Sequence, residues 1–236
     1  MRFAYFLSFF DKQQPEKDID TADFDRVVDI VSNTPALARG LIFRAERSVG
    51  RYYPNDDTPP QLAMELYFDR IEDLERALAP EGHLRQLAAP SVLPGLQQAE
   101  VQQQAMVVRR FKGDKPGEGP QQNPFCTFLV HYPGTADDFN AWIDHYIRYH
   151  AAIMTTFPGI REVEVCTRLD WRGFLPWPRV NYMQRNKVVF DSAEALIAAM
   201  SSPVRAEMTA DFNSFPPFHG GNVHYPLVTT EIVPGA

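Results

Sequence analysis

The pattern of hydrophobic and polar positions divides the chain into short strand-like segments and longer segments with helical spacing. In the first half it predicts strands at about 2–9, 40–48, 61–68 and 101–110, with helices at about 21–33 and 70–79. In the second half it predicts strands at about 125–132, 160–168, 182–190 and 222–232, with helices at about 136–155 and 192–209. Each half therefore has the order β-α-β-β-α-β.

A short sequence block occurs in both halves, at one offset of about 122 residues. The first copy is Phe68-Asp69 followed by Leu74, Ala77 and Leu78, and the second is Phe190-Asp191 followed by Leu196, Ala199 and Met200. Similarity at a long, fixed spacing indicates an internal duplication. The two halves are thus expected to be copies of one structural unit.

The repeated order is that of a ferredoxin-like unit, in which two helices cover one face of a four-stranded antiparallel sheet. We predict an α+β fold in which two such units, 1–111 and 125–236, pack sheet against sheet into a barrel-like sandwich with the helices outside. Residues 112–124, which include Lys112-Gly113-Asp114-Lys115-Pro116-Gly117, are polar and rich in Gly and Pro, as is typical of a linker.

Composition narrows the function classes. The net charge of -7, without clusters of Lys and Arg, is unfavourable for nucleic-acid binding. No segment has the roughly 20 apolar residues of a membrane span, and the apolar N-terminus resembles a strand more than a signal peptide. Cys126 and Cys166 are isolated, so they predict neither a disulfide framework nor a metal site. These features favour a cytoplasmic protein.

The second long helix is the most informative candidate element. Thr135 is the predicted N-cap, and Asp137 and Asp138 in the first turn complement the helix dipole. The apolar stripe of this helix consists of Phe139, Trp142, Ile143, Tyr146, His150, Ile153 and Phe157. His150 lies within the stripe. It is either a core side chain with a satisfied hydrogen bond or a general acid or base that burial keeps neutral.

Three further histidines are candidates for the same chemistry. His131 and His224 lie on the first and last strands of the second half, which we expect to be edge strands and not neighbours. His219 lies in an aromatic loop at 212–221, which is either the mouth of a pocket or a packed terminal loop. The catalytic candidates are therefore His150, His131, His219 and His224.

The second half resembles the EthD family of the dimeric α/β-barrel superfamily. The resemblance rests on Tyr149-His150-Ala151-Ala152-Ile153, Phe157-Pro158-Gly159-Ile160, Phe190 to Leu196, Ser202-Pro203 and Asp211-Phe212. It covers about residues 125–232, and the first half looks like a diverged copy. Ala152 departs from the family, which usually has a proline there. The resemblance implies the barrel fold and a role for His150 as the family's acid or base.

We therefore predict a cofactor-independent enzyme, a lyase or isomerase, that uses His150 on a small, mostly apolar aromatic compound in a catabolic or polyketide-type pathway. The expected substrate-binding residues are Trp142, Tyr146, Phe157, Trp177, Arg185 and Phe215. Arg185, or Arg168, is either a group that holds a substrate carboxylate or a surface charge on a strand. The loop around Trp177 is either a lid or a subunit contact, and a homodimer is expected.

Two alternatives stay open at this point. The superfamily includes haem proteins with a helix histidine as the axial ligand, so His150 would be the ligand in a haem-binding barrel. A non-catalytic carrier of hydrophobic metabolites is the other alternative, and it predicts no turnover. The sequence has no phosphate-binding Gly-rich loop, no Gly-x-Ser-x-Gly elbow and no metalloprotease motif. No metal site is predicted.

Overall fold

A computed structural model describes residues 2–49, 56, 58–114, 117 and 119–234. The first half contains β1 (Phe3–Phe10), α1 (Thr21–Ser32), β2 (Arg39–Ala45), β3 (Leu62–Phe68), α2 (Ile71–Ala77), the short 3-10 helices η1 (His83–Ala88) and η2 (Pro94–Leu96), and β4 (Glu100–Phe111). The second half contains β5 (Phe125–Tyr132), α3 (Phe139–His145), the π-helical turn η3 (Tyr146–His150), α4 (Ala151–Met154), β6 (Glu162–Arg168), β7 (Gln184–Phe190), α5 (Ala193–Met200), α6 (Val204–Phe212) and β8 (Val223–Ile232).

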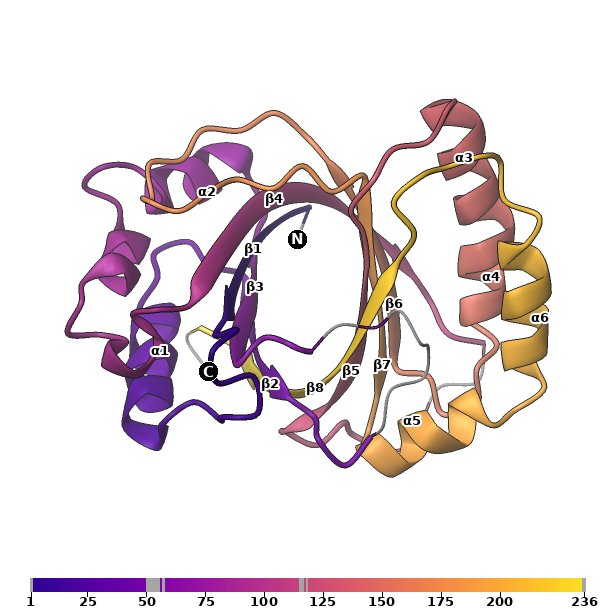
Figure 1. The fold of residues 1–236 in the computed structure, drawn as a ribbon, viewed down its shortest axis with the longest axis horizontal. Helices are drawn as coiled ribbons and strands as arrows, with labels where there is room; N and C mark the ends of the chain where they lie inside the picture. The colour runs from indigo at the N-terminus through magenta and orange to yellow at the C-terminus, as the bar shows by residue number, and fades with distance from the viewer. Residues whose placement is uncertain (1, 50–55, 57, 115–116, 118, 235–236) are drawn as a thin grey trace.

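The eight strands form one closed antiparallel barrel, in the order β1-β3-β2-β8-β5-β7-β6-β4. The strands of the two halves are hydrogen-bonded at two seams, β2 with β8 and β4 with β6. The predicted sandwich of two separate sheets is therefore replaced by a single closed sheet, which removes all strand edges. Helices α1 and α2 cover one side of the barrel, and α3 to α6 cover the opposite side (Figure 1).

Within each half the strands have the same spatial order, with the first strand between the last and the third. β5 therefore pairs with both β8 and β7. The expectation that the strands carrying His131 and His224 are non-adjacent edge strands is wrong. Val130 lies opposite His224, and His131 lies opposite Val223.

Side chains along each strand alternate between the barrel lumen and the helical layers. Tyr5, Leu7 and Phe9 of β1 join the helical layer of the first half. Ala4 and Phe6 of the same strand belong to an inner cluster that holds residues of both halves. The core thus has three parts, one under each helical layer and one inside the barrel.

Two predicted helices differ in detail. The helix predicted at 136–155 begins at Phe139, because Asp138 and not Thr135 is the N-cap: its carboxylate accepts hydrogen bonds from the backbone of Asn140 and Ala141, at 2.9 and 3.0 Å. The helix predicted at 192–209 is divided into α5 and α6. Pro203 explains the division, since proline lacks an N–H and disfavours helical geometry in the preceding residue.

The connections β2–β3 and β6–β7 each reach the other half. Residues 169–181, between β6 and β7, pass over β4 and lie against α2 (Figure 1), and the backbone N–H of Phe174 donates to the carbonyl of Leu78 at 2.8 Å. In the opposite direction, Val49 of the β2–β3 connection is buried in the core of the second half. Of the predicted linker, Lys115, Pro116 and Glu118 lie outside the described residues.

Candidate functional site

A cavity of about 430 Å³ lies between the outer face of the sheet and the helices of the second half. Its sheet wall is formed by β5, β7 and β8, and its helical wall by η3, α4, α5 and α6. The residues that line it are Phe128, Val130, Tyr132, Tyr146, His150, Met154, Phe157, Asn186, Val188, Met200, Arg205, Met208, Thr209, Phe212, Gly221, Asn222 and His224. Its size and mainly apolar lining suit a small aromatic or apolar molecule.

His150 enters this cavity from the π-helical turn. A π turn inserts an extra residue into a helix and is frequent at functional sites, because it redirects the side chains that follow. The ring of His150 lies between Tyr146 and Phe215, with centroid distances of 4.7 and 4.8 Å. Only 7% of the side chain is exposed. The imidazole is therefore held in one orientation by aromatic neighbours.

Asp211 of α6 orients His150 from behind. Its Oδ2 lies 2.7 Å from Nδ1 of His150, and its Oδ1 lies 3.0 Å from Nε2 of His145. Burial lowers the pKa of His150 to about 4, against the opposing effect of Asp211. His150 is thus neutral at neutral pH, with a proton on Nδ1 and the lone pair on Nε2. A histidine–aspartate pair of this kind is suited to taking up a proton.

Tyr146 and Asn186 add a polar group to the apolar wall. The Tyr146 hydroxyl donates to Oδ1 of Asn186 at 2.8 Å, and Nδ2 of Asn186 lies 3.6 Å from Sδ of Met154. Burial raises the pKa of Tyr146 well above its usual value, so this phenol stays protonated. Both residues line the cavity beside His150. Together they form an uncharged pair of hydrogen-bonding groups that a ligand oxygen can contact.

The structure brings together four of the predicted residues. His150, His224, Tyr146 and Phe157 line the cavity. Trp142 and Phe215 are not among its lining residues and instead pack against Tyr146, with centroid distances of 5.1 and 5.5 Å. They support the helical wall.

His131 and Arg185 point away from the cavity, into the barrel lumen. Asn186 faces the cavity, so its neighbour Arg185 faces the other side of β7. In the lumen, Nη1 of Arg185 lies 3.4 Å from Nε2 of His131, and the guanidinium stacks over Phe6 at 4.7 Å. Burial, then the charge of Arg185, lower the pKa of His131 well below its usual value. Neither residue reaches a ligand in the cavity.

His219 and Trp177 also lie elsewhere. His219 is exposed on the aromatic loop, with its Nε2 2.9 Å from Asp137. Trp177 packs edge-on against Phe9 of the first half, at a centroid distance of 5.4 Å. The loop around Trp177 thus covers the core of the first half rather than the cavity.

No role in the site was predicted for Asp211, Asn186 or Arg205. Asp211 belongs to the segments that resemble the EthD family, and its position on a helix beside an aromatic loop could have indicated a role in the site. Asn186 could have been found from strand alternation with Arg185. Arg205 carries the one positive side chain among the described cavity-lining residues, apart from any proton on a histidine. Nothing in its sequence context indicated that role.

A group of metal-ligand type lies in the lumen, not in the cavity. Carboxylates of Glu65 and Glu164 and the thiol of Cys166 lie within 4.8 Å of one another. Nζ of Lys187 lies 3.0 Å from Glu65 and 2.7 Å from Glu164. Both carboxylates are already paired with the lysine, so this group is an ion-pair network joining the two halves. Among the described residues, no helix is long and apolar enough to cross a membrane.

Comparison with known proteins gives similarity of structure alone. No protein-family model matches the chain, and no curated protein sequence matches it. An anthrone oxidase-like protein has a similar structure, with 14% identity over 100% of this chain and 94% of that chain and a TM-score of 0.64.

Two proteins named as putative monooxygenases are also similar. The one from Fusobacterium nucleatum has 11% identity, a TM-score of 0.59 and coverage of 100% of this chain and 94% of that chain. The one from Lactobacillus acidophilus has 14% identity, a TM-score of 0.52 and coverage of 100% and 97%. The chain therefore shares the fold of these proteins, with a histidine-lined cavity in its second half.

Proposed function

We propose that this protein is an enzyme that moves a proton at an activated carbon of a small, mostly apolar aromatic compound, with His150 as the base. The observation that carries the proposal is the pair of His150 and Asp211 at the wall of an apolar cavity. Burial keeps the imidazole neutral and basic, and the carboxylate fixes its tautomer. The proposed chemistry uses no bound cofactor.

In this mechanism, Nε2 of His150 removes a proton from a carbon that becomes conjugated with a phenol or ketone of the substrate. The electron pair of the broken C–H bond delocalises onto the substrate oxygen, where Tyr146 or Asn186 supports the developing charge. Asp211 stabilises the imidazolium that forms. If the proton returns at another carbon, the net reaction is an isomerisation.

The names of the structural neighbours support oxidation as the outcome to test before elimination or decarboxylation. Dioxygen is then the co-substrate: the carbanion reduces it, a C–O bond forms, and loss of water leaves a ketone. For an anthrone this conversion consumes one O₂ and yields an anthraquinone and one H₂O. In a decarboxylation, Nε2 of His150 would instead take the carboxyl proton of the substrate and return it to the carbon that has lost CO₂.

The test uses anthrone and dithranol as probes, together with a hydroxylated anthracene carboxylate. Oxygen uptake and CO₂ release are measured with the wild-type protein and with His150→Gln, against the uncatalysed rate. We expect the substitution to reduce the rate about 10²–10⁴-fold, as for a general base. Oxygen uptake identifies an oxygenase and CO₂ release a decarboxylase. Equal rates in wild type and variant would refute the proposal.

Haem binding is the second candidate function, and the same pair favours it. A histidine that ligates a metal almost always passes its other ring nitrogen to a carboxylate or carbonyl, as Nδ1 of His150 does to Asp211. Bound haem would supply redox chemistry, and Nε2 of His150 would hold its iron. A Soret band on addition of haemin that is lost in His150→Ala would establish this function in place of the cofactor-free one.

We also infer that the chain is a tandem duplication of a ferredoxin-like unit, and that its second half is EthD-like. The repeated strand order of the two halves supports the duplication. A homodimer remains a prediction, which light scattering of the purified protein tests.

A further inference from the structure

Two histidines face each other across the cavity, and each is bound by an aspartate. His150 lies on the helical wall with Asp211 behind it. His224 lies on the sheet wall, on β8, and its Nδ1 is 2.7 Å from Oδ1 of Asp56. A ligand in the cavity therefore lies between two imidazoles. Asp56 stands out because it belongs to the first half of the chain, whereas the cavity belongs to the second.

Asp56 reaches the second half through the β2–β3 connection. That connection follows β8 as it leaves β2, since the backbone N–H of Glu46 donates to the carbonyl of Pro226 at 3.0 Å. Val49 is then buried in the core of the second half. Asp56 itself is 5% exposed. A carboxylate this deeply buried requires strong hydrogen-bond donors.

His224 supplies two of these donors to the same oxygen. Besides the contact with Nδ1, the backbone N–H of His224 donates to Oδ1 of Asp56 at 3.0 Å. The ring is stacked on Phe128, with a centroid distance of 5.4 Å and an interplanar angle of 18°. Phe128 and Asp56 together fix both the plane and the rotation of the imidazole. Because the carboxylate accepts from Nδ1, the neutral form of this ring has its lone pair on Nε2.

We propose that Asp56 is a positioning residue that makes His224 the second acid/base group of the cavity. The inference rests on the proposed function and deepens it. While His150 takes the proton from carbon, Nε2 of His224 accepts the hydroxyl proton of the same substrate. The two proton acceptors select aromatic compounds that carry a phenolic hydroxyl on the same ring system as the reacting carbon. The first half thereby completes the site of the second half.

The first test measures the tautomer of His224 and needs no substrate. Long-range nitrogen–proton correlation NMR of the histidine rings assigns which nitrogen is protonated. We expect the Nδ1–H form in the wild type, retention of that form in Asp56→Asn, whose amide oxygen still accepts, and its loss in Asp56→Ala. The signals of His150 should not change. An Nε2–H form of His224 in the wild-type protein would overturn the proposal.

The matched control removes an equally buried aspartate of the first half. Asp23 is 2% exposed and accepts from the backbone N–H of Gly95 at 3.0 Å, within the helical layer of the first half. Asp23→Ala should lower thermal stability and leave the His224 tautomer unchanged. If Asp23→Ala alters the His224 signals as Asp56→Ala does, the effect is a general loss of structure and the positioning role fails.

The second test is a double-mutant cycle with dithranol, which carries phenolic hydroxyls, and anthrone, which carries none. Asp56→Ala and His224→Gln should each lower kcat for dithranol about tenfold or more, and the double variant should be no worse than His224→Gln. In each variant the loss of kcat should be smaller for anthrone than for dithranol. Equal losses from Asp56→Ala in the presence and absence of His224 would contradict the proposal. If His150→Gln has no effect, the proposed function fails, while the tautomer test still decides the role of Asp56.

Discussion

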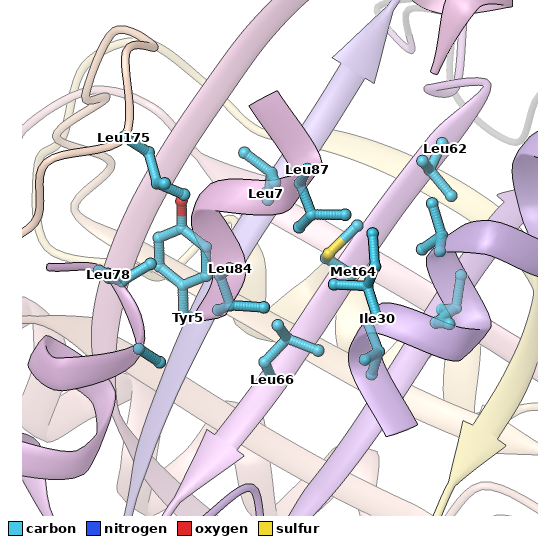
Figure 2. Packing of buried hydrophobic residues seen from close by; sticks show 14 of the residues in the cluster. Tyr5, Leu7, Ile30, Leu62, Met64, Leu66, Leu78, Leu84, Leu87 and Leu175 are labelled. Atoms are coloured by element: carbon cyan, nitrogen blue, oxygen red, sulfur yellow. The ribbon is translucent and has the colours of Figure 1, made fainter. Parts of the chain in front are cut away.

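The two halves of this barrel have the same strand order, but their helical layers differ. The layer of the first half is packed with side chains, whereas the layer of the second half encloses a cavity. In the first half, leucines of η1 and η2 fill the space between α1, α2 and the sheet, and Leu175 from the second half lies beside Tyr5 (Figure 2). In the second half, the corresponding space is a cavity of about 430 Å³. Similar backbone frameworks thus give a core in one half and a candidate site in the other.

The difference lies in the connections rather than in the strands. The β6–β7 connection delivers Trp171 and Trp177 to the first half, where they pack on Tyr5 and Phe9. The β2–β3 connection delivers Asp56 to a histidine of the second half. Each half thus contributes a connection to the other half. The β6–β7 connection contributes bulky aromatic side chains, whereas the β2–β3 connection contributes a carboxylate. Two halves with one strand order therefore differ in what their connections supply, and the candidate site lies in only one of them.

The largest expected effect concerns the network that joins the halves. Lys187→Met removes the ammonium that pairs with both Glu65 and Glu164 in the lumen. Because buried carboxylates are left without this partner, the free energy of unfolding should fall by about 3–5 kcal/mol. Chemical denaturation measures this. Lys12→Met, which breaks the exposed pair with Glu100, is the control and should cost less than about 1 kcal/mol.

The filled and hollow layers should respond differently to truncation. Leu87→Ala opens a void in the packed layer of the first half and should cost about 2–5 kcal/mol, without altering ligand binding. Met208→Ala enlarges a cavity that already exists and should cost about 1 kcal/mol or less. Denaturation of both variants is the measurement. Equal losses would show that the second layer is packed like the first.

The pH dependence tests the neutral state of His150. Its pKa in the folded protein is about 4, below the ordinary value of 6.5, so the unfolded chain binds this proton first as the pH falls. The related stability is fully present above about 6.5 and is lost progressively as the pH falls toward 4. The rate kcat/KM should likewise fall only as the pH approaches 4.

Asp211→Asn sharpens the same prediction. Asp211 raises the pKa of His150 against the effect of burial, so its neutralisation should move the acid limb of kcat/KM to still lower pH. Asp144→Asn is the control, because Asp144 pairs with Arg148 on the exposed side of the helix that carries His150. If the acid limb of kcat/KM moves to higher pH in Asp211→Asn, or moves equally in Asp211→Asn and Asp144→Asn, the assigned role of Asp211 is contradicted.

The smallest effect concerns selectivity for charge. Arg205 on the cavity wall should favour anionic ligands, but it is only half-buried. Arg205→Gln should therefore weaken binding of an anthracene carboxylate by about twofold to fivefold, and leave the matching anthracene methanol unchanged. Fluorescence titration gives both dissociation constants. Equal weakening of the two ligands would indicate lost packing instead of lost charge.

Much of the fold could be predicted from local patterns. Alternation and the repeated Phe-Asp block predicted the order of elements in both halves, and the stripe through Tyr146 and His150 pointed to the helix that lines the cavity. The location of His131 and Arg185 could not follow from the same evidence, since it depends on which face of a strand meets the helices. The partnership of Asp56 with His224 depends on a loop that crosses between halves, and no local pattern contains that information.

The most direct test of the central claim is hydrogen exchange at the acidic carbon of dithranol in D₂O without oxygen, followed by proton NMR. This isolates proton removal by His150 from any later step. We predict that the wild-type protein accelerates exchange at least about 10²-fold over buffer and that His150→Gln abolishes the acceleration. Exchange at the same rate with wild-type protein, His150→Gln and buffer would contradict the assignment of this cavity as a site of proton transfer.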